Sequence, residues 1–155
     1  MIDAMHSADV ANAERFERIG IAANAQTASL TRDEFASWLQ ERFELDPIRS
    51  SDLVLAINEA LANCAEFAYL ECPGTGTMDL QAWHDAVEST ITVLVSDRGS
   101  WRTPVEPNVR SRGRGIPLME ALSDRTSIKT SDHGTHVRLE WANVARAALR
   151  CRSAH

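Results

Sequence analysis

The chain has 155 residues, about the size of one domain, and its 44% apolar and 25% charged residues are typical of a globular protein. This composition excludes a disordered tail, a collagen-like fibre and a disulfide-stabilised miniprotein. The formal net charge of −6 argues against general affinity for nucleic acid or anionic membranes and is compatible with a basic protein partner. Lys129 is the only lysine, and no Gly-x-x-x-x-Gly-Lys-Ser/Thr motif surrounds it, which excludes a P-loop nucleotide site.

Cysteine usage and hydropathy indicate the compartment. The chain has an odd number of cysteines, Cys64, Cys72 and Cys151, which are widely spaced and form no Cys-x-x-Cys motif. They predict neither a disulfide framework nor a zinc site, and they favour a reducing compartment. The sequence has no apolar run of 18 residues and no signal-peptide pattern at residues 1–10. We therefore expect a cytoplasmic protein that binds neither nucleic acid nor membrane directly.

The first segment, residues 1–13, is small and polar and predicts a flexible N-terminal arm. A single domain is expected over residues 14–150, beginning with a strand at residues 15–23. Loose alternation along this strand gives three expected inward residues, which are Phe16, Ile19 and Ile21.

Two helices are expected next. Asn24 can cap the first helix, and Asp46-Pro47 ends it. Its apolar residues recur at helical spacing, namely Leu30, Phe35, Trp38, Leu39 and Phe43. Ser50 or Ser51 can cap the second helix, which is expected to run to about Tyr69.

Strands follow the second helix. Residues 77–84 and 88–97 have the pattern of a hairpin joined near residues 85–86. Residues 98–114 contain glycines and prolines but no apolar period, so we expect a long mobile loop there. A structureless loop of this length is unusual in a compact domain, and it is usually either functional or a sign that an element has been assigned wrongly.

The rest of the chain predicts a short helix, two strands and a closing helix. The short helix carries Ile116, Met119 and Leu122. The strands are expected at residues 127–131 and 135–141, and the closing helix at residues 142–150. The whole pattern indicates one α/β domain.

The second helix has two distinct faces. Glu59 and Asn63 lie one turn apart on the side opposite its apolar stripe, and their neighbours there are Ala56, Ala60 and Phe67. An ordinary solvent face would carry Lys, Glu and Arg instead of alanines. The apolar stripe consists of Leu53, Ile57, Leu61, Cys64 and Ala68.

This polar pair has two interpretations. In the functional one, Asn63 offers an amide oxygen to Mg²⁺ and Glu59 orients or deprotonates an attacking hydroxyl or water. In the other, two polar residues simply occupy one face of a helix in an alanine-rich protein, because Glu-x-x-x-Asn arises often by chance.

Asp97 ends the strand expected at residues 88–97, and alternation places it on the core face with Val93 and Val95. A carboxylate there is costly unless it accepts hydrogen bonds, and an adenine amine is a suitable donor. Alternatively, Asp97 caps a turn through nearby backbone N–H groups. Thr135 begins the last strand, where its hydroxyl could support the same base or simply belong to a β-branched strand residue.

Gly113 and Gly115 precede the short helix, with Pro117 in its first turn. Backbone N–H groups at such a helix start bind phosphates, and glycine allows close approach. The preceding segment is rich in arginine, with Arg98, Arg102, Arg110, Arg112 and Arg114. The other interpretation of this positive segment is a flexible, solvated loop.

The order and spacing of these motifs resemble the N, G1, G2 and G3 boxes of the GHKL ATPases, which include gyrase, the ninety-kilodalton heat-shock chaperone, histidine kinases and mismatch-repair ATPases. The residues within these motifs resemble even more closely those of the anti-sigma-factor serine kinases of bacteria. The matching runs are residues 53–63 (LVLAINEALAN), 95–101 (VSDRGSW), 112–119 (RGRGIPLM) and 134–139 (GTHVRL).

This resemblance implies a Bergerat-type ATP-binding fold, an α/β two-layer sandwich with a mixed, mostly antiparallel sheet and helices on one face. It implies ATP and Mg²⁺ as cofactors and a mobile ATP lid at about residues 98–114. By similarity, Glu59 is the catalytic base and Asn63 the Mg²⁺ ligand, while Asp97 recognises adenine with support from the Thr135 hydroxyl. The remaining implied nucleotide contacts, including lid hinges, are Gly99, Gly113, Arg114, Gly115 and Ile116.

The resemblance also implies partners. Kinases of this family phosphorylate a serine or threonine on a small STAS-type anti-sigma antagonist, and many hold a sigma factor inactive and form homodimers. Such family members commonly carry a histidine where this chain has Phe67, which removes a polar group near the phosphates. The alternative function is therefore a catalytically weak, nucleotide-gated protein-binding module. A histidine kinase is disfavoured, because no separate helical hairpin presents a histidine; His133 and His136 are expected on the surface.

Overall fold

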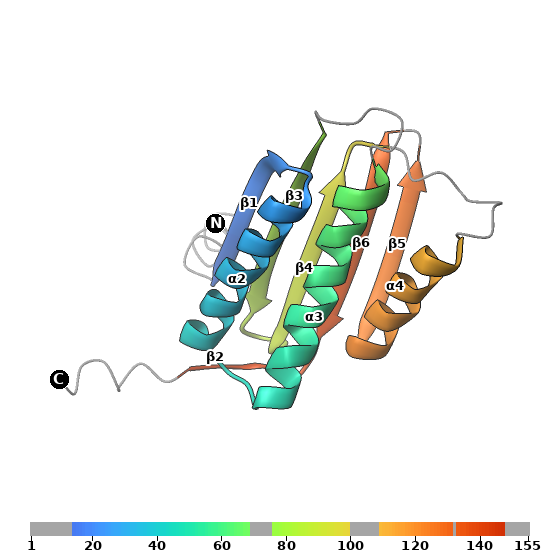
Figure 1. Cartoon of the computed structure of the whole chain (residues 1–155). Coiled ribbons are helices and arrows are strands. Elements are labelled where there is room, and N and C mark those ends of the chain that lie inside the picture. The colour runs from blue at the N-terminus through green and yellow to red at the C-terminus, as the bar shows by residue number, and fades with distance from the viewer. Residues whose placement is uncertain (1–13, 69–75, 100–108, 132, 148–155) are drawn as a thin grey trace, which may run out of the picture.

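The computed structural model describes residues 14–68, 76–99, 109–131 and 133–147, with the backbone alone at residues 67–68 and 109–115. A five-stranded sheet of order β1-β3-β4-β6-β5 is covered on one face by helices (Figure 1). The expected two-layer sandwich is confirmed, and every pairing in this sheet is antiparallel instead of mixed. The strands are β1 (Arg15–Ala22), β3 (Thr77–Asp85), β4 (Thr90–Asp97), β5 (Arg125–Ser131) and β6 (Gly134–Trp141).

The helices are α2 (Ala25–Arg42), α3 (Pro47–Asn63) and α4 (Val109–Leu122), and α3 continues into a π-helical turn, η1 (Cys64–Ala68). Helix α3 is the central one, in contact with α2 on one side and α4 on the other (Figure 1). A second, two-stranded sheet pairs β2 (Phe43–Glu44) with β7 (Ala145–Arg146). Within the described part of the chain, no helix is both long and apolar enough to cross a membrane.

Helix α2 begins as expected, because the Asn24 side chain accepts a hydrogen bond from the Thr27 N–H at 2.7 Å. Phe35, Trp38 and Leu39 are buried in the core. The expectation for Leu30 is wrong, since this side chain is 60% exposed. Five residues separate it from Phe35, which at 100° per residue places the two about 140° apart around the helix.

Strand β1 departs from strict alternation. Its pairing with β3 shifts register between Arg18 and Ile21, and Gly20 adopts a φ of +67°. This bulge leaves Ile19 54% exposed, against the expectation, whereas Phe16 is buried and Ile21 packs against the core.

Helix α3 begins earlier than expected. Asp46 is its N-cap, with a side chain that accepts from the Arg49 N–H at 2.7 Å, and Pro47 is its first residue. The Asp-Pro pair therefore begins α3, which excludes Ser50 and Ser51 as caps. The expectation that this pair ends the first helix is wrong, because α2 ends at Arg42 and Phe43, expected on that helix, begins β2. The expected end at Tyr69 lies outside the described residues.

The hairpin of β3 and β4 is confirmed. Its turn is closed by Asp85, whose side chain accepts from the Val87 N–H at 2.9 Å and the Glu88 N–H at 3.1 Å.

Helix α4 also begins earlier than expected, at Val109. Residues 109–114, expected as part of a loop, are helical, so Gly113 and Gly115 lie within the helix backbone instead of before it. Arginine is a good helix former, which explains why a segment without an apolar period is helical here. Residues 100–108 of the expected lid lie outside the described residues.

The expected closing helix at residues 142–150 is wrong for its described part. Val144 is fully buried, its N–H donates to the Ser89 carbonyl at 2.8 Å, and β7 follows it. Asn143 has a φ of +59°, which interrupts any helix. Tertiary pairing therefore overrides the helix propensity of this alanine-rich segment, and residues 1–13 and 148–155 lie outside the described ranges.

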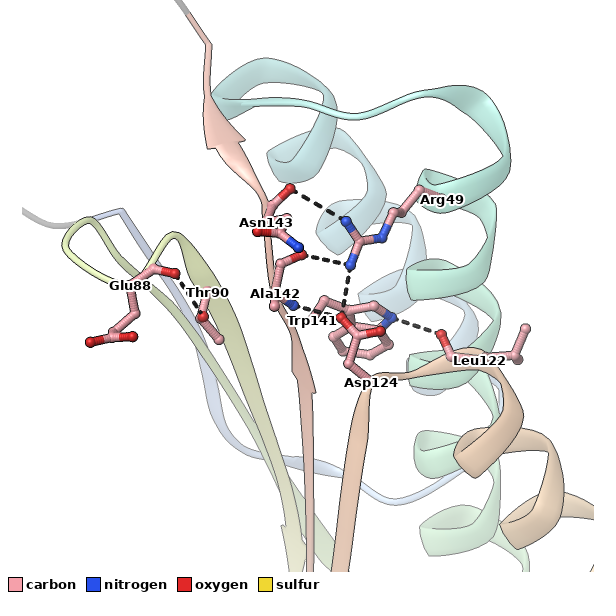
Figure 2. A network of polar contacts seen from close by, with 8 residues as sticks. All are labelled: Arg49, Glu88, Thr90, Leu122, Asp124, Trp141, Ala142 and Asn143. Carbon is pink, nitrogen blue, oxygen red and sulfur yellow. Dashed lines mark hydrogen bonds and ion pairs between the residues drawn. The ribbon is translucent and has the colours of Figure 1, made fainter.

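A polar network fixes the N-terminal end of α3 (Figure 2). The Arg49 guanidinium donates to the Ala142 carbonyl at 2.6 Å and to Asp124 Oδ2 at 2.9 Å. Asp124 Oδ2 also accepts from the Ala142 N–H at 2.7 Å, and Trp141 Nε1 donates to the Leu122 carbonyl at 2.8 Å. The network joins the beginning of α3 to the end of α4 and the end of β6.

Candidate functional site

The C-terminal end of α3 meets the end of β4 and the beginning of β6 (Figure 1). Cys64, directly after Asn63, places its Sγ 3.3 Å from Asp97 Oδ2. Asp97 in turn pairs with Thr135 across the β4–β6 ladder. Three residues predicted from separate motifs, Asn63, Asp97 and Thr135, are therefore brought to one end of the fold.

Asp97 lies on the core face of β4, as alternation predicts, and is 2% exposed. Its Oδ1 accepts a hydrogen bond from the Gly99 N–H at 3.0 Å, and its Oδ2 accepts from the Cys64 thiol. The turn-capping interpretation is thus correct in its geometry. It does not exclude the functional interpretation, because a cap needs no burial and this carboxylate is taken out of water at the strand end.

Asn63 and Thr135 are both buried, and each has a polar atom without a hydrogen-bond partner among the described residues: Asn63 Nδ2 and Thr135 Oγ1. A buried polar atom left unpaired costs about 1–3 kcal/mol, so native proteins retain few of them without a reason. Asn63 directly precedes Cys64, which contacts Asp97, and Thr135 pairs with Asp97 across the β4–β6 ladder. Such a set fits a ligand that brings its own polar groups, as a nucleotide does.

Gly134 allows β6 to begin close to the end of β4. Its φ is +139°, and a β-carbon at this position would overlap the backbone carbonyl of Asp97. No residue with a side chain fits there. The Gly-Thr pair is recognisable as a motif in the sequence, but this close approach is not, since it depends on how β4 and β6 pair.

Glu59 lies one helical turn before Asn63 on α3 and is partly exposed. No hydrogen bond or ion pair joins it to any other residue that the structure describes. Its neighbours Ala56 and Ala60 are fully buried, since α3 packs against helices on both sides. The alanines therefore belong to the packed core, and the Glu59 side chain beside them stays partly exposed.

Cys64 is the residue of this site that the sequence pattern did not indicate, because the apolar stripe counted it as core only. Burial first, and the nearby charge and hydrogen bond of Asp97 next, raise the pKa of this thiol well above its ordinary value. The thiol is therefore protonated at neutral pH and donates to the Asp97 carboxylate.

The other predicted contact residues lie on two segments. Gly99 follows β4 and donates its N–H to Asp97. Gly113 and Gly115 lie in the backbone of α4, the Arg114 side chain is outside the described part of the chain, and Ile116 packs against the core. Their assigned roles in nucleotide binding stay predictions.

No group of three or more His, Cys, Asp and Glu side chains that could hold a metal occurs within the described ranges. A Mg²⁺ site built from one protein oxygen together with ligand phosphates needs no such group, so Asn63 fits this role. His133 and His136 are exposed, as expected.

Comparison with known proteins agrees with this geometry. The sequence model of the family described as histidine kinase-like ATPase domain matches residues 21–141. Among solved structures, the chain is similar to the RsbU and RsbW domains of Rv1364c from Mycobacterium tuberculosis, with a TM-score of 0.65 and 24% sequence identity. The match covers 86% of this chain and 33% of that one, so this chain spans about a third of its length. At this identity the structural match supports the fold.

Proposed function

Because the chain belongs to the histidine kinase-like ATPase domain family, we propose that it is a Mg-ATP-dependent protein serine/threonine kinase of the anti-sigma-factor type. The observation that carries the proposal is the buried Asp97 carboxylate, with the unpaired Asn63 Nδ2 and Thr135 Oγ1 on neighbouring residues. The sequences of the motifs, and the similarity in fold to a structure that contains an RsbW domain, support the same assignment.

Asp97 is the residue that selects the base. An ionised carboxylate only accepts hydrogen bonds, so it favours a purine with a 6-amino donor over one with a 6-oxo acceptor. The Thr135 hydroxyl, buried beside it in the β4–β6 ladder, both donates and accepts, and so adapts to a ring nitrogen or to a bridging water.

Asn63 holds the metal through its amide oxygen. Mg²⁺ supplies neutralisation of phosphate charge and alignment of the transferring group. Burial of Asn63 restricts the positions open to this amide, so the oxygen would be held in place for a bound metal.

Glu59 is the proposed catalytic base. It accepts the proton of the serine or threonine hydroxyl of the protein substrate, and its partial exposure leaves room for a substrate side chain to approach. Its position one turn from Asn63 places the base and the metal ligand on the same side of α3.

The lid is proposed at about residues 98–114 of a single domain over residues 14–150. Gly99 supplies a backbone contact and a hinge, Gly113 and Gly115 supply contacts from within α4, and Arg114 and Ile116 complete the nucleotide contacts. Peptide N–H groups favour phosphate oxygens wherever the backbone leaves them exposed.

The proposed partner is a small STAS-type anti-sigma antagonist, whose phosphorylation controls transcription through partner switching. A sigma factor is the second proposed partner, and the net charge of −6 favours a basic surface on it. The protein is proposed to act in the cytoplasm as a homodimer.

A catalytically weak, nucleotide-gated binding module is the second candidate, favoured by Phe67, an apolar side chain four residues after Asn63. This candidate uses the same nucleotide site and differs only in transferring no phosphate.

Phosphate transfer separates the two candidates. The protein is incubated with Mg-ATP labelled at the γ-phosphate and a purified STAS-type antagonist. We expect labelled antagonist with wild type and none with Glu59→Gln, while both proteins bind ATP. Transfer that survives Glu59→Gln contradicts the assignment of the base, and ATP binding without transfer to any antagonist favours the binding module.

A further inference from the structure

Both oxygens of the Asp97 carboxylate are held from within the chain. The Gly99 N–H contacts Oδ1 at 3.0 Å and Cys64 Sγ contacts Oδ2 at 3.3 Å. The first contact is local, two residues along the chain. The second joins α3 to β4 across the core, over 33 residues of sequence.

We propose that Cys64 is a positioning residue for base selection: its thiol holds the Asp97 carboxylate in the orientation that accepts the 6-amino group of adenine. This inference rests on the proposed function, in which Asp97 recognises the base. It adds a residue outside the motif positions assigned to nucleotide contacts, and it assigns to Cys64 a share in the discrimination between 6-amino and 6-oxo purine nucleotides.

The position of Cys64 is tightly determined. The residue is 1% exposed, and its backbone N–H donates to both the Ala60 and Leu61 carbonyls where α3 changes into the π-helical turn η1. Such π-helical turns are frequent at functional sites. A side chain fixed in this way loses little entropy when it bonds Asp97, so a weak S–H donor is sufficient to orient the carboxylate.

The chemistry of the thiol favours a donor role over a reactive one. Burial and the Asp97 charge raise the pKa of Cys64 well above its ordinary value, which suppresses the thiolate needed for nucleophilic attack or metal binding. In the S–H form the thiol is a donor, and Asp97 Oδ2 is the acceptor in contact with it at 3.3 Å.

The unpaired Thr135 Oγ1 is an independent sign that a ligand completes this region. It is 1% exposed and lies on the residue that pairs with Asp97. A carboxylate oriented by Cys64 and a buried hydroxyl without a partner among the described residues together present an acceptor and an adaptable donor to one edge of a base.

The test is calorimetric titration of the full chain with Mg-ATP and with Mg-ITP, which differ only at the 6-amino edge of the purine. We expect Cys64→Ala to weaken Mg-ATP binding about three- to tenfold, the effect of about one hydrogen bond. Mg-ITP binding should change less than twofold. Cys64→Ser retains a donor and should restore most of the preference, and Cys64→Val provides a second donor-free variant if Cys64→Ala does not fold.

Val93→Ala is the matched control for lost packing, because Val93 is fully buried on the same face of β4 as Asp97. It should leave the ratio of the two affinities unchanged.

The outcomes are distinguishable. If Cys64→Ala leaves the ratio of the Mg-ATP and Mg-ITP affinities unchanged, the positioning role is overturned and the proposed function stays intact. A wild-type protein that binds Mg-ATP no better than Mg-ITP overturns both base selection by Asp97 and the role of Cys64.

Discussion

Gly134 packs its α-carbon against the backbone at Asp97, so closely that a β-carbon there would overlap the Asp97 carbonyl oxygen. The contact brings the first residue of β6 against the last residue of β4, and it places Thr135 directly opposite the buried carboxylate. One glycine thereby determines how near two of the proposed base-recognition residues lie.

Gly134→Ala should destabilise the fold by about 2–4 kcal/mol, because a positive φ and a backbone overlap both oppose the new methyl group. Urea unfolding measures the loss. Gly20→Ala is the matched control: Gly20 also has a positive φ, +67°, but a β-carbon added there would meet nothing within 4 Å, so a loss of about 1 kcal/mol is expected. Equal losses at the two glycines would show that the contact with Asp97 is not what requires Gly134.

Asn63→Ala should separate stability from metal-dependent binding. Removing a buried amide whose Nδ2 has no described partner should change the free energy of unfolding by less than about 1 kcal/mol without nucleotide. The added stability conferred by Mg-ATP should be lost. Asn58→Ala, whose side chain accepts from Arg32 on α2, is the control and should keep the Mg-ATP effect. Full Mg-ATP stabilisation of Asn63→Ala contradicts the metal assignment.

The Cys64 thiol predicts a pH dependence of stability. Its pKa is raised in the folded chain, first by burial and then by Asp97, whereas the unfolded chain begins to lose this proton near pH 8.5. The unfolded state therefore binds fewer protons above about pH 8.5, so the stabilisation is complete below this pH and is lost as the pH rises toward the folded-state pKa. Urea unfolding from pH 7 to 10 should show wild type losing stability relative to Cys64→Ser; parallel curves contradict this.

Arg49→Ala should weaken the fold at the end far from the site. The variant loses two hydrogen bonds to the carbonyls of Ala142 and Asn143 and the contact with a half-exposed Asp124, so about 1–2 kcal/mol is expected. Arg15→Ala removes an exposed pair with Glu17 and should cost less than about 0.5 kcal/mol. Mg-ATP should raise the melting temperature of both variants as in wild type, and a lost response in Arg49→Ala would mean that the network serves the site directly.

Much of the fold follows from local signals in the sequence. Asn24 caps α2 through its own side chain, Asp85 closes the hairpin turn, and alternation places Asp97 on the buried face of β4. Each of these depends on residues close together in the chain, where propensity and periodicity determine the outcome. The same signals predicted Glu59 and Asn63 as neighbours on α3.

The remaining features depend on contacts between distant segments. The bulge that exposes Ile19 involves pairing with β3, and the closing segment forms β7 because Phe43 and Glu44 are there to pair with it. The hydrogen bond from the Cys64 thiol to Asp97 likewise forms only when α3 packs on β4. Periodicity assigns a residue to a face but does not identify the atom it meets across the core.

The most direct measurement is thermal unfolding with and without Mg-ATP, on wild type and on Asp97→Asn. A ligand at a hundred times its dissociation constant adds about 2.7 kcal/mol, which should raise the wild-type melting temperature by roughly 5–10 °C. We predict this rise in wild type and its absence in Asp97→Asn. No rise in wild type at millimolar Mg-ATP, or an equal rise in both proteins, would contradict the assignment of Asp97 and its neighbours as the nucleotide site.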